Sequence, residues 1–242
     1  MSETGHSKNI ISFDKVISVC ESWGSTYNPS KASIKLAKLK TQHTDVDADN
    51  TLYATKARTN GDDKNLRKTE FAPVKKLSTK VVNALKATDA SDATIADAEG
   101  FLRKLRGERA GDSPKKPAAE VATGEDDNSH SVSQQSFTNI VEHLKGLNLV
   151  ASTETSYNPN ETELKTTNLA ALIVRLTLLN KNENTSFVAM ENARISRDKR
   201  LYAEKIGVLD TVEDIKEYAK SVFGANSPQL KQLTAIKFSR KR

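Results

Sequence analysis

Tyr27-Asn28-Pro29 occurs a second time in the chain as Tyr157-Asn158-Pro159, and each copy precedes a long segment with helical periodicity. An Asn side chain can accept hydrogen bonds from the first free backbone N–H groups of a helix. Proline fits the first helical position, because an N–H at that position has no partner within the helix. We therefore predict that each triplet begins a helix, and that the chain contains one structural unit twice.

Further short segments match between the two halves of the chain, always in the same order. The spacing between matching residues grows slowly from the first match to the last, as expected when short insertions follow a duplication. This pattern predicts a tandem repeat. The other matching segments are His6-Ser7 and His130-Ser131, Ser12-Phe13 and Ser136-Phe137, Asp63-Lys64-x-Leu66 and Asp198-Lys199-x-Leu201, and Phe101-x-Arg103-Lys104 and Phe238-x-Arg240-Lys241.

The composition favours helices. Only 5% of the 242 residues are aromatic, and Ala, Leu, Lys, Thr and Asn are abundant, which suits helices packed through aliphatic side chains better than a strand-rich sandwich. We predict an all-α fold of two tandem related helical bundles, each of about four helices. The bundles are expected at residues 6–107 and 134–242. Residues 108–133 contain almost no large apolar residue and are predicted to form a flexible linker.

Each bundle is expected to use the same succession of helices. The second helix follows the Tyr-Asn-Pro triplet, the third is interrupted at Pro73 or Gly207, and the fourth begins at a capping serine, Ser91 or Ser227. The first helix is predicted from apolar residues three and four positions apart. These residues are Phe13, Val16, Ile17 and Cys20 in one half, and Phe137, Ile140, Val141 and Leu144 in the other.

The segment Asp45-x-Asp47-x-Asp49 has the alternating carboxylates that open a calcium-binding EF-hand loop. Asn50 stands where that loop needs glycine, and Lys56 stands where it needs a bidentate glutamate. A turn between the second and third helices is therefore the favoured interpretation, matched by the Asn-rich segment 180–184 in the other half. The segment Asn60-Gly61-Asp62 is a competing position for the same turn.

Basic residues gather at the predicted end of each fourth helix and on the preceding helix. Cations at a helix C-terminus offset the negative end of the helix dipole, and this structural role is the favoured interpretation. Contact with phosphates or nucleic acid is the alternative. The candidate residues for such contact are Lys75, Lys76, Lys80, Arg103, Lys104, Arg106, Arg240, Lys241 and Arg242.

Sequence features that would indicate catalysis are missing. The chain has neither a Gly-rich loop ending in Lys-Ser or Lys-Thr nor a Gly-x-Ser-x-Gly elbow, and its one cysteine, Cys20, cannot form an intrachain disulfide. His43 falls on an apolar stripe, where a place at the edge of the core is favoured over a metal or proton role. We therefore expect no enzyme activity, no cofactor and no metal.

The charge balance and the hydropathy limit the partners and the cellular locations that the sequence predicts. A net charge of +6 arises from 37 basic and 31 acidic residues, so nucleic-acid binding is permitted but weakly indicated. The sequence contains no apolar run near the ~20 residues that span a bilayer. It also begins without a secretion signal, so we predict a cytoplasmic protein that does not enter a membrane.

Four segments resemble a group of uncharacterised tandem helical-repeat proteins of Bacteroidetes-type bacteria. The resemblance covers nearly the whole chain outside the predicted linker, and it implies no activity, cofactor or binding residue. The segments are Tyr27-Asn28-Pro29, Lys80-Val81-Val82-Asn83-Ala84-Leu85-Lys86-Ala87, Arg103-Lys104-Leu105-Arg106-Gly107 and Val222-Phe223-Gly224-Ala225-Asn226-Ser227-Pro228.

The sequence thus predicts a non-catalytic structural or protein-interaction protein. Its amphipathic helices are expected to bind a protein partner or to support self-association. Nucleic-acid binding through the basic helix ends is the alternative function.

Overall fold

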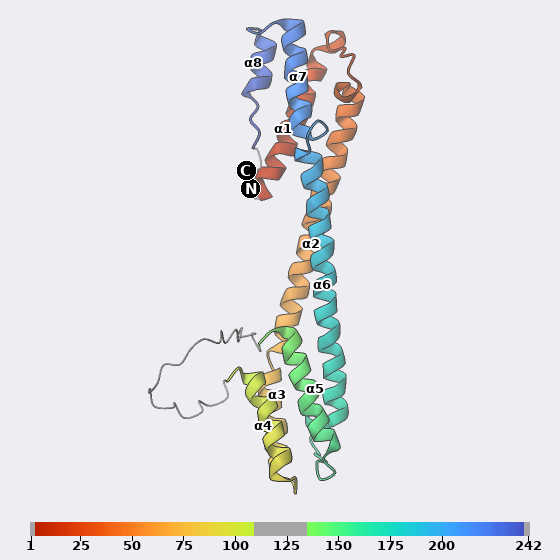
Figure 1. Ribbon diagram of the computed structural model, residues 1–242. Helices are drawn as coiled ribbons and strands as arrows, with labels where there is room; N and C mark the ends of the chain where they lie inside the picture. The colour runs from red at the N-terminus through yellow and green to blue at the C-terminus, as the bar shows by residue number, and fades with distance from the viewer. Residues whose placement is uncertain (1–2, 109–134, 240–242) are drawn as a thin grey trace, which may run out of the picture. The chain divides into compact units, whose positions relative to one another are not determined.

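The computed structural model describes residues 3–108 and 135–239 (Figure 1). Every regular element in these two ranges is a helix, so the predicted all-α class is confirmed for the described part of the chain. Most of the predicted linker and the candidates Arg240, Lys241 and Arg242 lie outside the described residues.

The described chain forms two compact units, and neither unit is one half of the sequence. Unit 1 contains the residues up to Gly61 together with those from Thr185 onward, whereas unit 2 contains Asp62 to Asn184. The predicted bundles at 6–107 and 134–242 therefore do not coincide with the compact units. Each unit instead takes one segment from each half of the chain.

The reason for this difference is that two long helices replace the predicted second and third helices of each half. Helix α2 runs from Leu36 to Phe71 and helix α6 from Thr166 to Tyr202. The predicted turns at Asp45–Asn50, at Asn60-Gly61-Asp62 and at 180–184 are wrong, because all three segments lie inside these helices.

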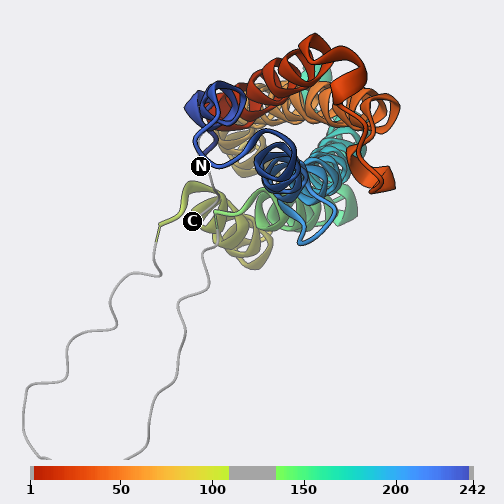
Figure 2. The same cartoon turned by 90° about the horizontal axis from the view of Figure 1, so that it is seen from above.

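Unit 1 is built from α1 (Glu3–Ser22), the first part of α2, the last part of α6, α7 (Val208–Phe223) and α8 (Pro228–Ala235). Helix α8 packs beside α1 and α7, as Figures 1 and 2 show. The apolar core of the unit comprises Ile10, Phe13, Val16, Ile17, Cys20, Tyr27, Ile34, Leu39, Val46, Leu201, Val208, Val212, Ile215, Ala219 and Leu233.

Unit 2 is built from the last part of α2, α3 (Val74–Lys86), α4 (Asp92–Arg106), α5 (Phe137–Thr153) and the first part of α6. Helix α4 packs against both α3 and α5. The core comprises Phe71, Val74, Val81, Val82, Leu85, Ala98, Leu102, Leu105, Ile140, Val141, Leu144, Leu147, Ala151, Tyr157, Leu164, Leu169, Ile173, Leu176 and Leu179.

The Tyr-Asn-Pro triplets do not begin helices. Each lies in a segment without regular secondary structure that leads into a short 3₁₀ turn, Ala32–Ile34 or Thr162–Leu164, and only then into α2 or α6. The tyrosine side chain holds each segment in place, because its buried hydroxyl donates to a backbone carbonyl seven residues later. The oxygen–oxygen distance is 2.7 Å from Tyr27 to Ile34 and 2.9 Å from Tyr157 to Leu164.

The predicted breaks and caps of the later helices are confirmed. Pro73 separates α2 from α3, and Gly207 precedes α7. The hydroxyls of Ser91 and Ser227 accept hydrogen bonds from the backbone N–H three residues later. Helix α8 ends at Ala235, however, so the expected continuation of this helix to the C-terminal basic residues is wrong.

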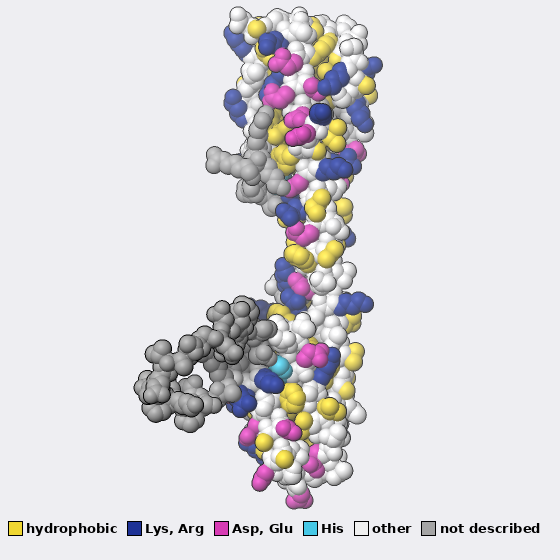
Figure 3. Space-filling view, in the orientation of Figure 1, with side chains coloured by type: hydrophobic (Ala, Val, Ile, Leu, Met, Phe, Trp, Pro, Cys, Tyr) yellow, Lys and Arg dark blue, Asp and Glu magenta, His cyan; other side chains and the backbone are white. Residues whose placement is uncertain are grey.

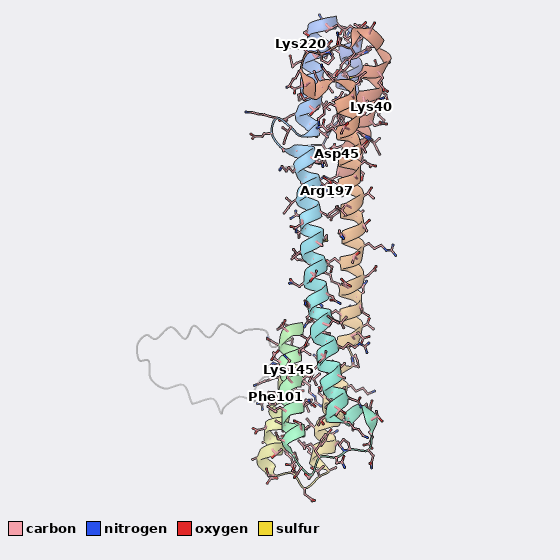
Figure 4. The ribbon with its side chains drawn as sticks, turned by 90° about the vertical axis from the view of Figure 1, so that its right-hand side faces the viewer. Lys40, Asp45, Phe101, Lys145, Arg197 and Lys220 are labelled. Carbon is pink, nitrogen blue, oxygen red and sulfur yellow. The ribbon has the colours of Figure 1, made fainter. Side chains whose placement is uncertain are left out.

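Gly146 on α5 tests the close packing of α4 against α5. Figure 4 labels Phe101 on α4 and Lys145, the residue before Gly146. A Cβ atom at Gly146 would overlap the ring of Phe101, whereas a Cβ atom at Gly100 on α4 would meet nothing within 4 Å.

We expect Gly146→Ala to destabilise the protein by about 1–3 kcal/mol, since overpacking outweighs the gain in helix propensity. Gly100→Ala is the matched control and should raise stability by up to about 1 kcal/mol. Urea unfolding followed by circular dichroism at 222 nm measures both values. Equal shifts in the same direction would contradict this packing.

Candidate functional site

The structure places the described basic candidates on two packed helices of unit 2, α3 and α4. Lys75, Lys76 and Lys80 are exposed on α3, and Arg103, Lys104 and Arg106 are exposed in the last turn of α4. Nη2 of Arg106 donates to Oγ1 of Thr79 at 3.1 Å, and that hydroxyl donates to the Lys75 carbonyl at 2.9 Å. These two bonds place the end of α4 beside the start of α3.

Several of these cations already have partners. Nζ of Lys80 lies 2.6 Å from Glu163, and Nη1 of Arg106 lies 3.7 Å from Glu108. Lys104 sits over the ring of Phe101, with its Nζ 5.4 Å from the centroid. Exposed pairs of this kind contribute little stability, but each carboxylate competes with a phosphate for its cation.

A cavity of about 360 Å³ lies between α3 and α4 beside these residues. Its charged lining mixes the cations Lys86, Arg103 and Arg106 with the carboxylates of Glu99 and Glu108. Lys86 donates to Glu99 and lowers the pKa of that carboxyl, so Glu99 stays ionised. On the face shown in Figure 3, positive and negative side chains are likewise interspersed within each unit. The cavity is therefore a poor match for a strongly anionic ligand.

A second charged cluster, which the sequence did not indicate, joins α2 and α6 in unit 1. Arg200 donates from Nε to Asp49 at 2.6 Å and from Nη1 to Asp45 at 2.9 Å. The hydroxyl of Ser196 donates to the same Asp49 carboxylate at 2.8 Å. The hydrogen bond that Arg200 donates to Asp49 is the main reason that the pKa of Arg200 is raised. Asp45 and Asp49 thus bind a guanidinium group from inside a helix, instead of opening a calcium loop.

Metal binding gains no further support from the described residues. Residues 3–108 and 135–239 contain no group of three or more His, Cys, Asp and Glu side chains placed to hold a metal ion. His43 is half-buried, with its ring 6.2 Å from that of Phe13. Burial raises the pKa of the Cys20 thiol to about 11, so this cysteine stays protonated near neutral pH.

Arg197 on α6 is the largest fully buried side chain of the described residues, at 1% exposure. Its Nε and Nη2 donate to Oδ1 of Asp198 at 3.1 and 2.9 Å. Its guanidinium carbon lies 4.2 Å from the ring centroid of Tyr53 on α2. Figure 4 shows Asp45 and Arg197 on the facing helices α2 and α6. A buried charge is costly unless it is paired. The pairing with Asp198 and the contact with the Tyr53 ring therefore hold these two side chains in position.

An apolar groove of about 550 Å³ lies between α1 and α2 in unit 1. Ile11 on α1 lines this groove and is 57% exposed. Across the groove, α2 contributes Tyr53 and two small residues, Ala54 and Ala57. Ser7, Lys8 and Asn50 complete the lining and are polar. We call this site the α1–α2 groove.

The α1–α2 groove was missed at the level of sequence, although two weak signals exist. Ile11 lies off the buried stripe of α1, and Ala54 and Ala57 are three positions apart, as on one face of a helix. Combining Ile11 with the two alanines into one site requires the knowledge that α1 and α2 line the same groove. The turns predicted at Asp45–Asn50 and at Asn60-Gly61-Asp62 would interrupt this part of α2, so the groove does not follow from the sequence.

A smaller cavity of about 320 Å³ in unit 1 borders the Asp45–Asp49–Arg200 cluster. It is lined by Gln42, Ser196, Lys199, Arg200 and Ile206. The amide of Gln42 donates to the Ile206 carbonyl at 3.1 Å and thereby closes one side of this cavity.

Comparison with known proteins gives no assignment, because no family model, curated protein or solved structure matches the chain. No described helix is both long enough and apolar enough to cross a membrane.

The buried Arg197 gives a direct test of the α2–α6 arrangement beside the groove. We expect Arg197→Ala to destabilise unit 1 by about 3–5 kcal/mol, because it removes the buried guanidinium that pairs with Asp198 and packs against the ring of Tyr53. Arg194→Ala is the matched control, since Arg194 pairs with Glu191 on the exposed face of the same helix. This control should cost at most about 1 kcal/mol. Urea titration monitored by tyrosine fluorescence compares the two, and similar losses would refute the role of Arg197.

Proposed function

We propose that the chain is a non-catalytic protein-interaction protein, and that the α1–α2 groove binds an apolar segment of a partner protein. The single observation that carries this proposal is an apolar groove whose lining includes an exposed isoleucine, Ile11. Apolar concave surfaces with a few polar groups at the rim are the usual form of a recognition site. A partner segment covering Ile11 would gain roughly 25 cal/mol for each Å² of apolar surface that it buries.

The wall of the α1–α2 groove that α2 forms is rigid, and this rigidity supports binding of a partner segment. Tyr53 forms part of that wall, and its ring is held against the buried guanidinium of Arg197. A side chain that is already fixed loses little entropy on binding, so more of the contact energy appears as affinity. Ala54 and Ala57 leave room for the partner's larger side chains, as in grooves that bind an amphipathic helix.

We also propose that the chain is a tandem repeat that acts in the cytoplasm. Support for the repeat comes from pairs of equivalent local structures. The Tyr27–Ile34 and Tyr157–Leu164 hydrogen bonds match, as do the serine caps of α4 and α8. The long helices α2 and α6 each follow a 3₁₀ turn of three residues.

Nucleic-acid binding is the second candidate function, favoured by the gathering of Lys75, Lys76 and Arg106 on unit 2. The described structure places no carboxylate within ion-pair distance of Lys75 or Lys76. Phosphate contacts release counterions, so binding of this kind would weaken steeply with salt. Retention on immobilised DNA or RNA at low salt, lost in Lys75→Glu/Lys76→Glu, would favour this function over the groove.

The groove proposal is tested by blocking the groove without disturbing the core. Ala54 is exposed, so Ala54→Arg should fold normally while its long side chain fills the site. Val174→Arg on α6 of unit 2 is the matched control, since Val174 is also an exposed apolar residue and lies outside the groove. The wild-type chain and the two variants are each immobilised to capture binding partners. Circular dichroism confirms that each of the three is folded.

We expect proteins captured by the wild-type chain to be lost with Ala54→Arg, with at least a tenfold drop in retained amount, and kept with Val174→Arg. Quantitative mass spectrometry of the three captures makes the comparison. An identical set of captured proteins with all three baits would overturn the assignment of the groove.

A further inference from the structure

Each hydrophobic core of the protein joins side chains from both halves of the chain. In unit 2, Leu85 and Leu105 come from the first half, and Leu144 and Leu176 come from the second. Unit 1 combines Phe13 and Leu39 with Leu201 and Ile215 in the same way. The described halves, residues 3–108 and 135–239, are therefore packed against each other in both units.

The apolar faces within one half cover each other only in part, through the packing of α3 against α4 and of α7 against α8. In the first half, the core residues of α1 belong to unit 1, whereas those of α3 and α4 belong to unit 2. The second half divides in the same manner between α5 and the pair α7 and α8. A single half would leave two sets of apolar side chains in water, so it requires the other half as a partner.

Polar contacts between the halves make this pairing specific. Nη1 of Arg67 in the first half donates to Glu183 in the second half at 2.7 Å, and both side chains are less than one-fifth exposed. The amide of Asn60 donates to the hydroxyl of Ser186 at 3.1 Å in a buried site. An incorrect register would leave such groups buried without partners, which is costly.

We propose that the half-to-half interface is a self-recognition surface, and that a second copy of the chain can exchange halves with the first. In the resulting dimer, the first half of each copy packs against the second half of the other. Every core contact and every polar contact between the halves is then reproduced. This inference does not depend on the function proposed for the groove.

The balance between one chain and the exchanged dimer depends on concentration. The contacts are the same in both forms, so the main difference is the entropy of bringing the halves together. A covalently attached half has an effective concentration on the order of 1 mM. Exchange should therefore appear when unfolded protein is refolded at roughly millimolar concentration.

The first test uses the full chain with a protease site inserted after Glu120 and the native sequence elsewhere. After cleavage, the two halves should elute together with the mass of the intact chain, 26.6 kDa apart from the insert, in size-exclusion chromatography with light scattering. They should separate only in denaturant. Halves that separate under native conditions would overturn the proposal.

The second test uses the ion pair between Arg67 and Glu183. Arg67→Glu alone opposes two carboxylates, and Glu183→Arg alone opposes two guanidinium groups. In an exchanged dimer of one Arg67→Glu chain with one Glu183→Arg chain, each of these contacts has opposite charges again. Refolding the mixture should therefore favour the mixed dimer over either like dimer by about tenfold, a ratio typical of coupled charge pairs.

A matched control uses Glu142 and Lys145, which pair at 2.7 Å within α5 and so lie in the same half. Mixing Glu142→Lys chains with Lys145→Glu chains cannot restore this pair by exchange, and no mixed dimer should be favoured. Native mass spectrometry with one chain isotopically labelled counts the species. The proposal fails if the Arg67 and Glu183 mixture yields no more mixed dimer than this control.

Discussion

Burial of apolar side chains between the two halves is the constraint on which the structure depends. The buried side chains of α1 and α5 lie in cores that also contain side chains from the other half of the sequence. The short helices α3, α4, α7 and α8 follow the same rule. Because most helical stability comes from packing an apolar face, the partner half determines where each helix lies.

This constraint explains why α2 and α6 remain helical through unfavourable residues. Asp45, Asp49, Asn60 and Gly61 lie inside α2, although isolated helices disfavour each of them by up to about 1 kcal/mol. The contacts made with α6 offset those costs. The two aspartates accept from Arg200, and Asn60 donates to Ser186. The same contacts align the buried Arg197 with Tyr53, which shapes one wall of the α1–α2 groove.

The sequence was sufficient for features that depend on nearby residues. The helix stripe from Phe13 to Cys20, the break at Pro73 and the serine caps at Ser91 and Ser227 follow from local chemistry and are present in the structure. The Tyr-Asn-Pro triplet was misinterpreted, because its tyrosine hydroxyl binds a carbonyl seven residues away. The pairing of halves and the α1–α2 groove depend on residues far apart in the chain. Hydropathy patterns do not encode such pairings, because each stripe fits more than one partner.

The most direct measurement of this arrangement is a chemical cross-link between the two halves. Lys80 on α3 and Glu163 near the start of α6 form an exposed pair at 2.6 Å, and the only native cysteine, Cys20, is buried. A Lys80→Cys/Glu163→Cys chain treated with a short bis-maleimide at low protein concentration should give one internally cross-linked species in high yield. The yield should fall to background in urea. A native yield no higher than that in urea would show that these halves do not pack together, and it would contradict the account.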